Sequence, residues 1–185
     1  SLSITFFGIV GNVKRFMLEY LPAWLLLTIG GLIVFHAPIT VWVGVHIPSL
    51  ALGIKAWKEL LMLVAAGLLV VALTRAGQLK EFIKKPVITL ALLYVAIHIV
   101  SLGFYPQAAQ PAVAGLMIDL RYVVYFVLVY AFLTLYPSYK KSFILVGLTG
   151  ALIVVGFAMM QLFLPKYSLE ALGYGDSTIK PYMTV

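Results

Sequence analysis

Long apolar segments alternate with short polar connections along this chain, and the alternation repeats five times. A helix of roughly 20 residues, rising 1.5 Å per residue, crosses about 30 Å of hydrocarbon. The pattern therefore predicts an all-α, polytopic transmembrane helix bundle of about five spans. We expect the spans at residues 21–43, 56–74, 86–104, 114–136 and 143–164.

The composition excludes a water-soluble domain. Hydrophobic residues make up 63% of the 185 residues, charged residues only 10%, and the mean hydropathy is +1.09. Soluble domains usually carry about a quarter charged residues. The absence of cysteine excludes disulfides, thiolate nucleophiles and cysteine metal ligands. The net charge of +7 does not predict nucleic-acid binding, because no basic run is interleaved with stacking aromatic residues.

The two ends of the chain and its prolines carry further expectations. Residues 1–20 have an apolar run too short to cross a bilayer, which favours an amphipathic segment lying at the interface. Pro38 and Pro48 predict that the first span ends early or breaks, followed by a short interfacial or re-entrant piece. Residues 165–185 are expected to begin an external periplasmic loop that is truncated here, so the chain is interpreted as a piece of a longer protein. No internal repeat is expected.

The basic residues predict the orientation. Eight lie in connections on one side of the membrane: Lys14, Arg15, Arg75, Lys80, Lys84, Lys85, Lys140 and Lys141. Four lie on the other side: Lys55, Lys58, Lys166 and Lys180. Because cytoplasmic loops carry the excess of Lys and Arg, the N-terminus is expected in the cytoplasm and the C-terminal segment outside.

Asp119 and Arg121 are the most informative residues, since both lie inside the fourth apolar segment. A charge at bilayer depth costs at least about 2.5 kcal/mol, which makes both residues candidates for substrate binding. They are two residues apart and do not share a helix face, whereas Arg121 and Tyr125, four apart, do. Two interpretations stay open: Arg121 contacts an anionic substrate group, or it pairs with a neighbouring helix while Asp119 reaches the outer interface.

A second cluster, Lys55-Ala-Trp57-Lys58-Glu59, opens the second span. Lys55 and Glu59 form an i,i+4 pair, and Trp57 suits the membrane interface, so an ordinary anchor is one interpretation. The other is that Lys58 or Lys55 attracts phosphate at the outer headgroup level. No metal site is expected, because His36, His46 and His98 have neither H-x-x-x-H spacing nor a carboxylate partner in the sequence. His98 is expected to be hydrogen-bonded within the bundle.

Three passages together resemble the O-antigen ligase and O-antigen polymerase-like family of bacterial inner-membrane proteins. They are residues 36–63 with Lys55-Ala-Trp-Lys-Glu59, the Asp119-Leu-Arg-Tyr122 motif within a span, and Leu172-Gly-Tyr-Gly-Asp-Ser-Thr-Ile-Lys-Pro-Tyr182 after the last span. The last passage is similar to the opening of the family's large external loop.

The resemblance implies a multi-pass protein of the bacterial inner membrane that transfers or polymerises glycan carried on undecaprenyl pyrophosphate at the outer face. It implies no cofactor and no metal, membrane lipids as partners, and catalytic residues beyond Val185. Arg121 is the residue that matches the family's membrane-embedded arginines. From the residues alone two other classes stay open: a small-solute or lipid transporter that uses Asp119, Arg121 and His98 as a coupling site, and a non-catalytic assembly subunit.

Overall fold

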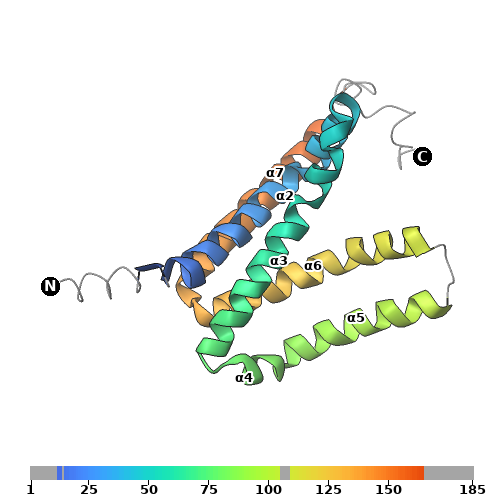
Figure 1. Cartoon of the computed structure of the whole chain (residues 1–185). Coiled ribbons are helices and arrows are strands. Elements are labelled where there is room, and N and C mark those ends of the chain that lie inside the picture. The colour runs from blue at the N-terminus through green and yellow to red at the C-terminus, as the bar shows by residue number, and fades with distance from the viewer. Residues whose placement is uncertain (1–11, 14, 105–108, 165–185) are drawn as a thin grey trace. The chain divides into compact units, whose positions relative to one another are not determined.

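The structure, a computed structural model, describes residues 12–13, 15–104 and 109–164, and every regular element in these ranges is helical (Figure 1). Within these ranges, five helices are long and apolar enough to cross a membrane, which confirms the predicted all-α, multi-span fold class. In chain order the elements are η1 (Phe16–Tyr20), α2 (Leu21–His46), η2 (Pro48–Leu50), α3 (Ala51–Arg75), α4 (Leu79–Ile83), α5 (Pro86–Phe104), α6 (Ala109–Leu135), η3 (Pro137–Tyr139) and α7 (Lys140–Gln161).

The chain divides into two compact units, and each is described by itself. The first contains Ser1–Leu26 and Leu61–Lys140. Its core is formed by apolar side chains spaced three or four residues apart, the spacing that places residues on one face of a helix. The most buried of them are Leu26, Ala65, Leu69 and Phe132. Within this unit α5 and α6 lie side by side (Figure 1).

The second unit contains Leu27–Leu60 and Lys141–Val185, and glycines bring α2 and α7 together in it. A Cβ atom added at Gly150 would lie 3.3 Å from Cγ1 of Val34, and one added at Gly31 would lie 3.9 Å from Cγ1 of Val146. Small residues let helix backbones approach closely where lipid supplies no hydrophobic driving force.

The expectation that the first span ends early or breaks at Pro38 is wrong. Helix α2 runs through Pro38 to His46. Proline in a helix interior costs about 3 kcal/mol in water because it removes a hydrogen bond and crowds the preceding turn. Membrane helices accept it where neighbouring groups satisfy the freed carbonyl. The piece that follows is only the short 3-10 helix η2, and the helix that contains the second predicted span begins at Ala51, five residues before the expected start of that span.

The other element boundaries agree with the predicted spans to within a few residues. Helix α5 has the predicted bounds, and α7 begins and ends three residues earlier than expected. Helix α6 starts at Ala109, because Pro111 lies in its first turn, where the missing backbone donor has no intrahelical partner. The described end of the expected interfacial segment, Phe16–Tyr20, is a π-helix that continues directly into α2.

Two connections use the same backbone joint. Ile47 before η2 has φ −138° and ψ 68°, and Tyr136 before η3 has φ −131° and ψ 69°. Each is followed by Pro-Ser, and each donates its N–H to the carbonyl four residues earlier at 2.8 Å. Proline fixes φ near −65° and excludes the residue before it from the α region, so each joint ends one helix and begins the next within four residues. The sequence pattern, in which no internal repeat is expected, does not predict this local match.

A different device ends α3. The N–H of Gln78 donates to the carbonyl of Leu73 at 3.0 Å, and that of Gly77 to the carbonyl of Thr74 at 3.1 Å. Gly77 has φ 69°, a conformation that glycine adopts without a Cβ penalty. These bonds form a Schellman motif, which satisfies the last carbonyls of the helix and turns the chain into α4.

Candidate functional site

Arg121 lies on the buried stripe of α6. Tyr125, Leu128 and Phe132 follow it at helical spacing, and their exposure falls along the series until Phe132 is fully buried. The hydroxyl of Tyr125 donates to the backbone carbonyl of Leu26 at 2.9 Å, which fixes this face of α6 against α2 within the first unit. The Nε atom of Arg121 is buried, so the guanidinium extends from a packed face and not from a lipid-facing one.

Asp119 lies on a different face, as the two-residue spacing requires. Its side chain is 56% exposed, and Oδ2 lies 4.0 Å from Nε2 of His98 on α5. His98 is 26% exposed and its Nδ1 lies 3.0 Å from the carbonyl oxygen of Tyr94, one turn earlier in α5. The expectation that the histidines have no carboxylate partner is therefore wrong for His98, because the packing of α5 on α6 supplies one from 21 residues away in sequence.

Lys58, the third predicted substrate-binding residue, belongs to the second unit and is buried. Only 1% of its side chain is exposed, although it lies near the start of α3. Its Nζ lies 2.7 Å from Nε2 of His36, 3.0 Å from the carbonyl oxygen of Lys55 and 3.4 Å from Oε1 of Glu59. Burying a lysine is costly unless its amino group is hydrogen-bonded, and three partners provide that here. Of the two lysines predicted to attract phosphate, Lys55 and Lys58, only Lys55 has an exposed side chain.

His36 lies at the centre of a cluster of four side chains, those of His36, Thr40, Trp57 and Lys58. Besides Lys58, its ring contacts two side chains through Nδ1: the indole N–H of Trp57, which donates at 3.3 Å, and the hydroxyl of Thr40 at 3.4 Å. The four side chains come from two helices, with His36 and Thr40 on α2 and Trp57 and Lys58 on α3. The sequence predicts no partner for His36, because a contact between residues 22 apart depends on how the two helices pack.

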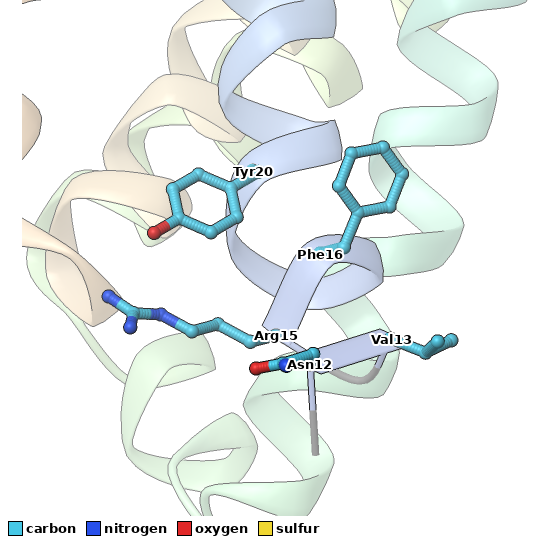
Figure 2. A pocket seen from close by; sticks show the side chains of 5 residues that line it. All are labelled: Asn12, Val13, Arg15, Phe16 and Tyr20. Atoms are coloured by element: carbon cyan, nitrogen blue, oxygen red, sulfur yellow. The ribbon is translucent and has the colours of Figure 1, made fainter. Parts of the chain in front are cut away.

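A shallow pocket of about 470 Å³ lies at the beginning of the described chain. Figure 2 shows the side chains of Arg15 and Tyr20 extended to one side of it and those of Val13 and Phe16 to the other. The guanidinium of Arg15 donates to Glu19 at 2.9 Å, and this carboxylate raises the pKa of Arg15. An arginine whose charge is already balanced in this way is a weak anion site, and we assign no function to the pocket.

Among the described residues, no group of three or more histidine, aspartate or glutamate side chains gathers closely enough to hold a metal ion. The predicted external loop, residues 165–185, and its Gly173-Tyr-Gly175 passage lie outside the described residues. Comparisons of the chain with protein-family models, curated proteins and solved structures find no match.

Proposed function

We propose that this chain is the N-terminal membrane portion of an O-antigen ligase or polymerase-like protein of the bacterial inner membrane. In this proposal the complete protein transfers or polymerises glycan carried on undecaprenyl pyrophosphate at the outer face. The observation that carries the proposal is Arg121, a guanidinium on the packed face of α6 within an apolar span. Two passages that do not contain Arg121, residues 36–63 and 172–182, also resemble the family and support the proposal.

The chemistry of such a transfer suits this residue. Displacing a glycan from a lipid pyrophosphate develops negative charge on the leaving phosphate, and preorganised donors in a dry site stabilise that charge. Arginine presents a planar fork of donors that matches phosphate oxygens two at a time. By helical rise Arg121 lies roughly 10 Å below the predicted outer boundary, a depth accessible to a lipid substrate that enters sideways from the bilayer.

The test uses the full-length protein, since the catalytic residues are expected beyond Val185. Arg121→Lys keeps the charge but loses the planar fork, and Arg121→Ala loses both. We expect both variants to reduce glycan transfer per folded molecule, with lysine retaining part of the activity. The matched control is Arg75→Ala, because Arg75 is an exposed arginine in the last turn of α3. It should transfer glycan as the wild type does.

A structural role for Arg121 gives a different result. Arg121→Ala would then lower the amount of folded protein in the membrane, and the surviving molecules would turn over normally. Activity per folded molecule separates the catalytic role from the structural one. It is the transfer rate divided by the amount of monodisperse protein recovered in detergent. Wild-type specific activity in Arg121→Ala would refute the proposal.

The His98–Asp119 pair favours a second candidate, a small-solute or lipid transporter. A histidine and a carboxylate that face each other across two spans, 4.0 Å apart, can hold a transported proton. The residues that follow Val185 in the complete protein discriminate between the candidates. A long external loop containing histidine and arginine, followed by further spans, supports transfer, whereas an inverted repeat of the five spans supports transport.

A further inference from the structure

The hydrogen bonds around His36 determine which ring nitrogen carries its proton. The indole nitrogen of Trp57 can only donate, and it points at Nδ1 of His36 at 3.3 Å. Nδ1 must therefore offer a lone pair. A neutral imidazole carries one proton, so that proton lies on Nε2, which faces Nζ of Lys58 at 2.7 Å.

This tautomer determines the state of Lys58. If Nε2 of His36 donates, Nζ of Lys58 must accept, and an ammonium group has no lone pair with which to do so. A neutral amine has one lone pair and two N–H groups. The lone pair matches His36, and the two N–H groups match the carbonyl oxygen of Lys55 and Oε1 of Glu59, at 3.0 and 3.4 Å.

The alternative, an ammonium group on Lys58, leaves one contact unsatisfied. Three N–H groups could then serve His36, Lys55 and Glu59, and the Glu59 carboxylate would attract the charge. His36 would have to carry its proton on Nδ1, where it would meet the indole N–H of Trp57. In the first arrangement the hydroxyl of Thr40, 3.4 Å from Nδ1, shares the single lone pair of Nδ1 with Trp57, and in the second it accepts from Nδ1–H. Because the indole N–H can only donate, the contact with Trp57 favours the first arrangement.

We propose that His36 and Lys58 form a proton-accepting pair in which Lys58 is held as a neutral amine. The pair takes up one proton by a relay through the imidazole. A proton arriving at Nδ1 of His36 displaces the bond from Trp57, and the proton on Nε2 passes to Nζ of Lys58. The product is a neutral His36 with its proton on Nδ1 and an ammonium on Lys58, which is one positive charge more than before.

Two of the ionisable side chains described above, His36 and Glu59, face this proton. His36 faces it from α2, and Glu59 faces it from α3, where Lys55 contributes its backbone carbonyl while its own side chain is exposed. The Glu59 carboxylate stabilises the ammonium once it forms, and Trp57 stabilises the neutral pair. The site is thus a base with two defined states, one with a neutral amine on Lys58 and one with an ammonium group. This proton-accepting role differs from the phosphate-attracting role predicted for Lys58. The pair goes beyond the proposed function, because it needs no lipid-linked glycan.

The experiment is nitrogen-15 NMR of the full chain in lipid bilayers, labelled at lysine and histidine. At neutral pH we expect one of the lysine signals to be that of an amine, and to disappear in Lys58→Met. We also expect a histidine ring protonated on Nε2, whose signals disappear in His36→Gln. A lysine spectrum that contains ammonium signals alone would overturn the proposal, whatever the transfer activity of the protein.

Trp57→Phe tests the cause. It removes the indole donor but keeps an aromatic ring, so the amine signal should convert to an ammonium signal. The matched control is Trp42→Phe on α2, since Trp42 stacks on His46 and takes no part in the cluster; it should retain the amine. An amine signal that persists in Trp57→Phe would overturn the role of Trp57. If Trp57→Phe does not fold, the wild-type spectrum still decides the state of Lys58.

Discussion

The substitutions Gly150→Ala and Gly147→Ala are expected to change the free energy of unfolding in opposite directions, although the two glycines lie only three residues apart on α7. In a helix interior, glycine to alanine gains about 0.5–1 kcal/mol because the unfolded chain loses freedom. At Gly147 nothing lies within 4 Å of the added Cβ, so this gain is expected in full. At Gly150 the Cβ would lie 3.3 Å from Cγ1 of Val34, closer than ordinary van der Waals contact.

Val34 cannot easily move aside, because a β-branched side chain in a helix has one strongly preferred χ1 rotamer. Inserting a methyl group into a packed contact of this kind costs about 1–3 kcal/mol, which exceeds the gain in helix propensity. We therefore expect Gly147→Ala to be more stable than the wild type and Gly150→Ala to be less stable, with the two variants about 1–3 kcal/mol apart.

The assay is reversible unfolding in mixed micelles, followed by circular dichroism. A double-mutant cycle with Val34→Ala identifies the contact, because removing Cγ1 of Val34 should relieve most of the cost of alanine at Gly150. Equal stabilisation by alanine at both positions would show that α2 and α7 do not approach each other at Val34. A cost at Gly150 that Val34→Ala leaves unchanged would place the clash elsewhere.

Two further predictions concern topology and the first unit. Because the chain has no cysteine, single cysteines at Lys84 and Gln110 should react with an impermeant thiol reagent from opposite sides, with position 110 labelled in intact cells; outside labelling at 84 would reverse the predicted orientation. Tyr125→Phe should lower unfolding stability by about 0.6 kcal/mol, the average for a hydrogen bond between membrane helices, whereas the control Tyr122→Phe, on an exposed face, should not. Equal effects of the two would remove the assigned role of the Tyr125 hydroxyl.

The five candidate spans among the described residues could be predicted from the sequence, because hydrophobicity is a local property. Pro86 begins α5 where a missing donor costs little, and its predicted bounds agree with the structure. The prediction failed at Pro38, since whether a proline ends a membrane helix depends on what surrounds the freed carbonyl. It also missed the pairs that define the candidate sites. Lys58 meets His36, and Asp119 meets His98, through the packing of two helices, which residue spacing within one helix does not encode.

The lengths of the helices determine how the protein responds to bilayer thickness. Helix α5 has 19 residues and is about 28 Å long, which only just covers a typical hydrocarbon core. The continuous helix from Phe16 to His46 has 31 residues and is about 46 Å long, so it must tilt or extend into the headgroup region. A thicker membrane therefore leaves the ends of α5 short of the interface before it affects the longer helix. Hydrophobic mismatch acts first on α5, the helix that carries His98, and acyl-chain length becomes a variable that sets the environment of the His98–Asp119 pair.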